Sequence, residues 1–234
     1  MDAVGLAALW TALAGPLSSA RVPPPTLRAN AFAELAAGRI VRNKLPGDGL
    51  AAFGVLPVSQ ALLWLTVTDD HLSDDVAELT EVRLHGAWSS PKTLYQRIDL
   101  PWPFADRHYV LRSENNAALA AHGVWERAWH VDNTEIQAAR ALTDAALFDA
   151  AETLSVNRGD WLLVPVDAEH TLTVYQSWTD LGGAILPEAT EAWSRATVEG
   201  LFRSVEKHSV DVEKRYGPGC AVQGGPDGVP IPCG

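Results

Sequence analysis

The stretch from Leu100 to Arg112 reads Leu-Pro-Trp-Pro-Phe-Ala-Asp-Arg-His-Tyr-Val-Leu-Arg, and it separates two segments with the pattern of β-strands. The first segment runs from Thr93 to Leu100 and the second from Arg107 to Ser113. Proline cannot donate a hydrogen bond to a sheet ladder, so Pro101 and Pro103 must interrupt or turn the sheet. The pattern therefore predicts consecutive strands of a meander joined by a proline-rich turn.

The remaining elements are predicted from hydrophobic periodicity and turn residues. The further strands are expected at 35–44, 50–56, 80–88, 124–132, 161–166 and 171–180. Helices are expected at 57–68 and 134–151. The chain is thus predicted to form a mainly antiparallel sheet with a few helices.

The last strand leads into one long helix. Residues 180–187 read Asp-Leu-Gly-Gly-Ala-Ile-Leu-Pro, and the helical pattern that follows stops at Gly217. Apolar and small side chains share one broad side of this helix, among them Trp193, Thr197, Gly200, Leu201 and Val205. The small residues on that side indicate either close packing of the helix on the sheet or space left between them.

Strands on both sides of a proline-rich break, then Gly-Gly-x-x-Leu-Pro and a long final helix, resemble the bacterial START-like lipid-binding domains. These belong to the helix-grip (SRPBCC, Bet v 1-like) superfamily. Their break often reads Pro-x-Pro-x-x-x-Arg-Asp-Phe-Val, which falls on Pro101–Val110, with His108 here in place of Asp and Tyr109 in place of Phe. The resemblance covers roughly residues 35–216. It implies an α+β helix-grip fold, in which a curved antiparallel sheet wraps around the C-terminal helix and leaves an internal hydrophobic cavity.

Strand parity predicts which side chains face that cavity, because successive residues of a strand point to opposite faces. In the strand at 124–132, Trp125, Arg127 and Trp129 share the face expected to point inward. A buried Arg127 needs a partner or a ligand. The alternative is that the strand bulges and the guanidinium reaches solvent.

Hydrophobicity places Leu172, Val174, Gln176 and Trp178 on the inward face of the strand at 171–180. Gln176 is then a polar contact in an apolar wall. Together with the final helix, the predicted cavity residues are Tyr109, Leu111, Trp125, Arg127, Trp129, Gln176, Trp178, Trp193, Thr197, Gly200, Leu201 and Val205.

The resemblance implies that the domain binds a hydrophobic small molecule, such as a lipid or sterol, and transports or sequesters it without a cofactor. The alternative is an enzyme similar to the polyketide cyclases and aromatases of the superfamily. Such an enzyme needs an acid or base in the cavity, and the candidates are His85, Tyr109 and Glu126, of which parity points Glu126 outward. A third alternative is an interaction module with a solid core. The chain contains no hydrolase nucleophile elbow, no phosphate-binding loop and no metal-binding His or Cys spacing.

The net charge of −11 argues against nucleic acid as a partner, since phosphates require clustered Lys and Arg. It also argues against simple electrostatic docking to anionic lipid. The expected partners are the hydrophobic ligand and a transient membrane contact, and the expected state is a monomer.

The chain is expected to divide into a signal-peptide candidate with a Pro-rich linker at 1–26, a START-like domain at 27–217 and a Gly- and Pro-rich tail at 218–234. The apolar run at 4–14 is either a secretory signal or a short helix packed on the domain; Asp2 stands where a signal would carry a basic residue. Cys220 and Cys233 both lie in the tail, where a disulfide would suit an oxidising compartment. A periplasmic or secreted protein is therefore expected, with the cytoplasm as the alternative.

Overall fold

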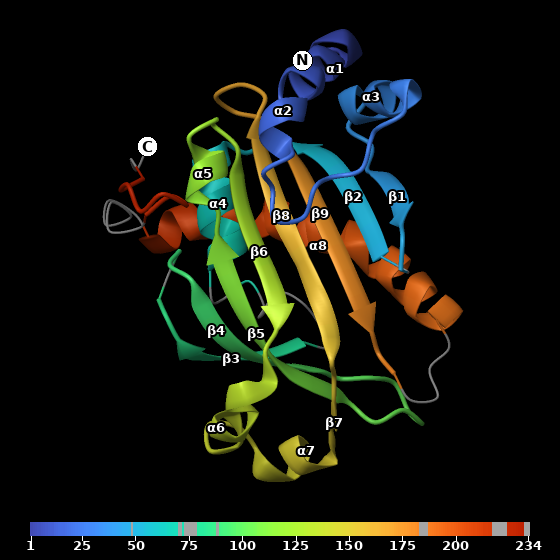
Figure 1. The fold of residues 1–234 in the computed structure, drawn as a ribbon, viewed down its shortest axis with the longest axis vertical. Helices are drawn as coiled ribbons and strands as arrows, with labels where there is room; N and C mark the ends of the chain where they lie inside the picture. The colour runs from blue at the N-terminus through green and yellow to red at the C-terminus, as the bar shows by residue number, and fades with distance from the viewer. Residues whose placement is uncertain are drawn as a thin grey trace.

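The structure, a computed structural model, describes residues 1–47, 49–69, 72, 79–87, 89–182, 187–216 and 224–231. In the last helix it describes the side chains from residue 198 onward, except those of 213, 215 and 216. Within these residues nine strands form one sheet (Figure 1). The strands are β1 (Val41–Leu45), β2 (Gly49–Leu56), β3 (Leu79–His85), β4 (Lys92–Ile98), β5 (Arg107–Asn115), β6 (Trp125–Val131), β7 (Glu152–Thr153), β8 (Val156–Pro165) and β9 (Thr171–Asp180).

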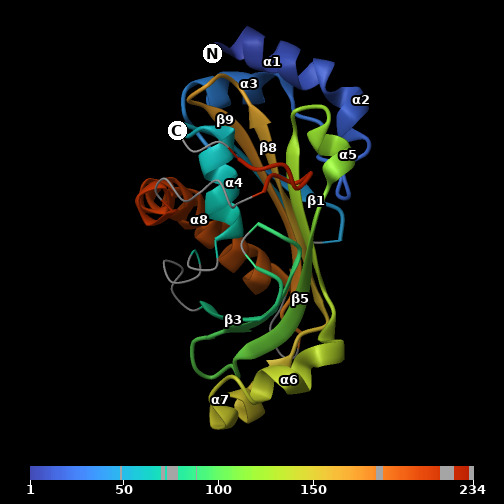
Figure 2. The ribbon, with the colours of Figure 1, turned by 90° about the vertical axis from the view of Figure 1, so that its left-hand side faces the viewer.

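The sheet has the order β1-β2-β9-β8-β6-β5-β4-β3, and every neighbouring pair along this path is antiparallel. The short β7 pairs in parallel with β5. Figure 2 shows the sheet bending toward the side on which α8 lies. The predicted α+β helix-grip fold is therefore confirmed.

The described helices lie on both faces and at one end of the sheet. They are α1 (Ala3–Ala12), α2 (Ala14–Leu17), α3 (Ala29–Ala36), α4 (Gln60–Thr68), α5 (Ala117–Ala120), α6 (Ile136–Arg140), α7 (Ala145–Ala150), α8 (Pro187–Tyr216) and the 3₁₀-helix η2 (Asn133–Glu135). We call the face covered by α4 and α8 the inner face, and the opposite face, on which α1–α3 pack, the outer face.

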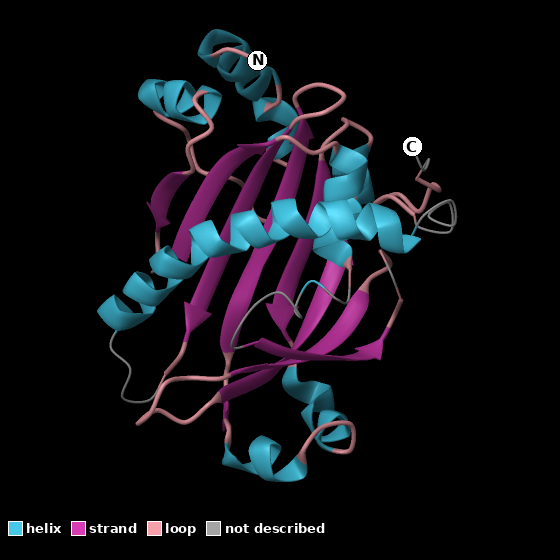
Figure 3. Cartoon of the chain, turned by 180° about the vertical axis from the view of Figure 1, so that it is seen from behind, coloured by secondary structure: helices cyan, strands magenta, loops and turns pink. Residues whose placement is uncertain are grey.

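The inner face holds the long helix α8, which crosses the sheet obliquely (Figure 3). Part of the space between α8 and the sheet is filled by packed side chains. There Val198, Phe202 and Val205 of α8 pack with Leu63 of α4. Gly54 lets the helix approach closely, because a Cβ at that position would lie 2.9 Å from the Phe202 ring. Burying each of these large side chains contributes about 1.5–3 kcal/mol, so the sheet rather than helix propensity holds α8 in place.

The outer face is buried as well, by the N-terminal helices. Leu6 and Leu17 share a hydrophobic cluster with Phe53 of β2 and Leu162 of β8. Trp10 meets Phe53 edge to face, with ring centroids 5.8 Å apart. The apolar run at the N-terminus thus forms a helix packed on the sheet, as the second interpretation of that run predicts. None of the described helices has the length and apolar composition that a membrane span requires.

The proline-rich break joins β4 to β5, as expected. Arg107, at the start of β5, donates hydrogen bonds to the backbone carbonyls of Ala105, Leu181 and Gly182 and pairs with Glu152 at 3.1 Å. The buried guanidinium therefore ties the break to the end of β9.

Two predicted elements are wrong. The expected strand at 35–44 begins only at Val41, because residues 29–36 form α3, whose Leu35 is buried in the outer cluster. The expected helix at 134–151 is divided into η2, α6 and α7. The division follows from Asp144, whose carboxylate accepts from the backbone N–H groups of Ala146 and Leu147 and so starts a new helix.

Candidate functional site

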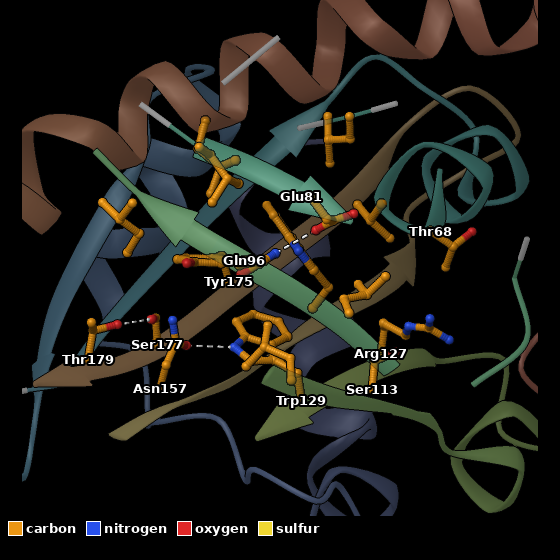
Figure 4. Close-up of a pocket in the computed structure, with 18 of the residues that line it drawn as sticks. Thr68, Glu81, Gln96, Ser113, Arg127, Trp129, Asn157, Tyr175, Ser177 and Thr179 are labelled. Carbon is orange, nitrogen blue, oxygen red and sulfur yellow. Dashed lines mark hydrogen bonds between the residues drawn. The ribbon is translucent and has the colours of Figure 1, made fainter. Parts of the chain in front are cut away.

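A cavity of about 430 Å³ lies between the inner face, α4 and α8 (Figure 4). Most of its wall is apolar. The apolar lining residues are Leu50, Val67, Leu72, Leu79, Leu94, Ile98, Tyr109, Leu111, Trp129, Trp161, Tyr175, Val198, Gly200 and Leu201. The volume falls within the usual range of ligand pockets, about 300–1,000 Å³.

A chain of side-chain hydrogen bonds crosses the inner face and lines this cavity. The Trp129 indole donates to Asn157 Oδ1 at 3.0 Å, and Asn157 Nδ2 donates to the Tyr109 hydroxyl at 2.8 Å. Tyr109 donates to Gln96 Oε1 at 2.9 Å, and Gln96 Nε2 donates to Glu81 Oε2 at 2.6 Å. We call these five residues the polar chain; they come from the five strands β6, β8, β5, β4 and β3.

Strand pairing sets the geometry of the polar chain. Glu81, Gln96 and Tyr109 are direct cross-strand partners. Gly159 of β8 lets the Trp129 ring lie across its strand, because a Cβ there would come within 2.6 Å of that ring. Burial raises the pKa of the Tyr109 hydroxyl, so the phenol stays protonated and can donate at neutral pH.

Two buried cations lie toward the other end of the cavity. Figure 4 shows Arg127 and Ser113 at the end opposite Asn157. Arg127 donates from Nη1 to the carbonyls of Ser89 and Ser90, at 3.3 and 2.8 Å, and to Asn115 Oδ1 at 2.7 Å. Arg127 is 4% exposed, so it does not reach solvent by a bulge.

The second cation at this end is Lys92, whose Nζ donates to the carbonyl of Thr68. Asp69, which also lines the cavity, accepts from His208 of α8 at 2.8 Å in a buried pair. This contact ties the end of α4 to α8 beside the cavity.

Gly200 lies on the part of α8 that faces the cavity. A Cβ built at Gly200 would meet no heavy atom within 4 Å among the described residues, apart from the neighbouring backbone of its own helix. The small residues on this side of the helix were expected to indicate either close packing on the sheet or space left between helix and sheet. At Gly200 the structure has space.

Six of the predicted cavity residues line the cavity in the structure: Tyr109, Leu111, Arg127, Trp129, Gly200 and Leu201. Two others pack in the solid part of the inner core, since Val205 is fully buried there and Trp125 meets Trp64 edge to face at 5.7 Å. The side chains of Trp193 and Thr197 lie outside the described part of the molecule, as do both Cys220 and Cys233.

The predicted orientation of β9 is wrong. Trp178 packs with the outer-face cluster, and its indole donates to the carbonyl of Pro46 at 2.8 Å. Gln176 likewise faces outward, where its Nε2 donates to the carbonyl of Val22 at 2.9 Å. Tyr175 and Ser177, the residues of opposite parity, line the cavity instead. The cause is that the N-terminal helices cover the outer face of this strand, so its more apolar side chains pack against them.

Outward-facing Gln176 belongs to a buried polar cluster under the N-terminal segment. Its Nε2 also donates to Asp160 Oδ1 at 3.0 Å. Asp160 Oδ2 and Gln176 Oε1 have no hydrogen-bond partner among the described residues. Burial, and then the charge of nearby Glu126, raise the pKa of Asp160 well above its ordinary value.

Glu126 holds the same N-terminal segment to the sheet. Its carboxylate accepts from the backbone N–H groups of Arg21 and Val22, at 2.8 and 3.3 Å, and from Asn116 Nδ2 at 2.6 Å. Glu126 thus points away from the cavity, as parity predicts. His85 lies on the exposed end of β3 against Glu135. Of the three acid–base candidates, Tyr109 alone lines the cavity.

Sequence reasoning missed several polar lining residues: Glu81, Lys92, Gln96 and Asn157. The signal for Gln96 was present, since Leu94, Gln96 and Ile98 alternate on one face of β4 and all line the cavity. In the described part of the chain, no three His, Cys, Asp or Glu side chains gather so as to hold a metal ion.

Comparison with solved structures finds the same fold. A STAR-related lipid transfer protein from Xanthomonas axonopodis superposes with a TM-score of 0.57 at 16% identity, over 73% of this chain and 92% of that one. Human StAR-related lipid transfer protein 5 has a TM-score of 0.57 at 11% identity, over 92% of this chain and 99% of its own. Human STARD10 has a TM-score of 0.58 at 8% identity, over 77% and 73% of the two chains. At these identities the likeness is one of fold.

Comparisons of sequence add nothing to this. No family model matches the chain, and no curated protein matches it. The helix-grip fold is therefore established by the structure and its solved neighbours.

Proposed function

We propose that this helix-grip domain binds one hydrophobic small molecule in the cavity between its sheet and α8, and shelters or carries it. The observation that supports this most is the cavity itself, about 430 Å³ of space with a mostly apolar wall. A core built only for stability would fill such a volume, because each void costs stability. At Gly200 the chain even omits a side chain that the space would accommodate.

The driving force would be removal of the ligand from water. An apolar ligand that buries roughly 300–500 Å² gains about 8–12 kcal/mol before the costs of ordering are subtracted. The polar chain on the inner face would orient it. Tyr109, the acid–base candidate in the cavity, is a neutral phenol already engaged at 2.8 and 2.9 Å by its neighbours. These features favour binding over bond chemistry.

We propose that the loop between β4 and β5 makes a transient contact with membranes. Trp102 is 92% exposed and Phe104 is 40% exposed, so two aromatic side chains stand in water close together in sequence. Aromatic rings of this kind favour the membrane–water interface. The loop begins just after Ile98, which lines the cavity, so contact at this point would bring a membrane close to the ligand.

The experiment that tests the proposal is solvent extraction of the purified protein followed by mass spectrometry of the extract. We expect a hydrophobic compound in an amount close to one molecule per chain, and expect it to rebind when returned to the stripped protein. Incubation of that compound with the protein should leave its mass unchanged. An empty extract, together with failure of a panel of apolar compounds to bind, would contradict the proposal.

A further inference from the structure

The polar chain has a fixed direction, and this determines what it offers to a ligand. An indole N–H can only donate and a carboxylate can only accept, so Trp129 must be the first donor and Glu81 the last acceptor. The two amides between them are oriented accordingly: each receives a hydrogen bond on its oxygen and donates one from its nitrogen. The Tyr109 proton is fixed on the Gln96 side for the same reason.

This arrangement uses one N–H of each amide and leaves a second. A primary amide carries two N–H donors. Asn157 Nδ2 donates one of its N–H groups to Tyr109, and Gln96 Nε2 donates one of its N–H groups to Glu81. No second acceptor for either nitrogen is present among the residues that the structure describes. Both amides line the cavity, one on each side of the Tyr109 hydroxyl.

The geometry points to a ligand whose polar end is an uncharged hydroxyl group, and we propose that it binds at Asn157, Tyr109 and Gln96. This rests on the proposed function, since it names the class of molecule that the cavity takes. A hydroxyl oxygen can accept from an amide N–H, and its hydrogen can donate to an oxygen of the polar chain. Asn157 is buried and Gln96 is partly buried, so an amide N–H that gains such an acceptor inside the cavity no longer lacks a partner.

A carboxylate or phosphate fits this place less well. Gln96 Nε2 lies 2.6 Å from Glu81, so an acceptor on its second N–H would lie about 5 Å from that carboxylate, given ordinary hydrogen-bond lengths. Like charges at that distance in a partly buried site repel. An anionic end would instead favour the opposite end of the cavity, where Arg127 and Lys92 donate to backbone carbonyls.

The experiment compares three probes with the same apolar body: dodecan-1-ol, dodecanoic acid and dodecane. Each competes with a neutral environment-sensitive dye for the full chain at neutral pH. We expect the alcohol to bind at least about tenfold more tightly than either of the others. Equal affinities, or a preference for the acid, would overturn the inference while leaving the proposed function intact. If neither the dye nor any probe binds, the proposed function itself fails.

A variant locates the effect. Gln96→Met replaces the amide with an apolar group of similar length, and it should lower the affinity for the alcohol about tenfold without weakening dodecane. Gln137→Met is the matched control, because it makes the same exchange at an exposed position of α6 outside the cavity lining, and it should keep the alcohol preference. Loss of the preference in both variants, or in neither, would overturn the assignment to the polar chain. If Gln96→Met does not fold, the three-probe comparison on the unaltered protein still decides.

Discussion

Replacing Gly200 with leucine is expected to close the cavity without harming the fold. The position lines the cavity, and outside the backbone of α8 an added Cβ meets no heavy atom of the described residues within 4 Å. Four new carbon atoms would occupy space otherwise available to about four ligand methylenes. At about 0.8 kcal/mol for each methylene, the loss of binding is about 3 kcal/mol, or roughly a hundredfold in Kd.

The same substitution should favour the helix. Glycine in a helix interior costs about 1 kcal/mol relative to alanine, and leucine is nearly as good a helix former as alanine. For a domain of this size, a gain of about 1 kcal/mol raises Tm by about 2–4 °C. Close packing would give the opposite sign, because overpacking a core typically costs about 1–3 kcal/mol.

The assay pairs a dye titration with a thermal melt on each variant. Gly15→Leu is the matched control: Gly15 lies in the helix α2, away from the cavity, and a Cβ there also meets nothing within 4 Å. It should leave dye binding unchanged. A lower Tm for Gly200→Leu with undiminished binding per folded molecule would show that Gly200 allows close packing of α8 rather than space for a ligand.

Three further predictions concern other parts of the chain. The pKa of Asp160 is raised in the folded state. Its full contribution to the free energy of unfolding is therefore present below the pKa of an unfolded aspartate, about 4, and is lost as the pH rises above it. The loss is at most about 1.4 kcal/mol per pH unit. In Asp160→Asn the amide can donate to Gln176 as the protonated acid would, so the free energy of unfolding, measured by denaturant titration, should depend less on pH between pH 5 and pH 8. An unchanged pH dependence would exclude Asp160 as its source. Trp102→Ser should weaken cosedimentation with neutral phosphatidylcholine vesicles about tenfold at unchanged Tm, since that side chain is 92% exposed, and equal cosedimentation would remove the loop from the membrane contact. Cys220 and Cys233 should be disulfide-linked in protein from its native compartment, and a count of two reactive thiols per chain would contradict this.

Elements with one dominant local signal could be predicted from the sequence. The proline-rich break between β4 and β5 requires a sheet interruption, and the long run ending before Gly217 requires a helix, which the structure ends at Tyr216. On β6 the inward face was identified correctly, because Arg127 and Trp129 alternate with residues that face the opposite side.

The error on β9 has a physical cause, which is burial of the strand on both of its faces. Assigning the faces of a strand by hydrophobicity assumes that one face is exposed to solvent. Both faces of β9 are covered, so Trp178 and Gln176 were assigned to the wrong face. The covering helices come from the N-terminus, and their docking on the sheet is a tertiary contact with no local signature. The polar chain could not be predicted from local sequence either, because its members come from five strands. Only the register of the sheet brings Glu81 and Asn157 into one hydrogen-bonded network.

Native mass spectrometry of the intact chain, purified without detergent or organic solvent, would show directly whether the cavity holds a ligand. We expect a bound mass in the range of a small hydrophobic molecule, at a ratio of one per chain. That mass should be lost after solvent extraction and greatly reduced in the Gly200→Leu variant. A chain that carries no such mass, and acquires none from an equimolar apolar ligand, would contradict the claim that the cavity is a binding site.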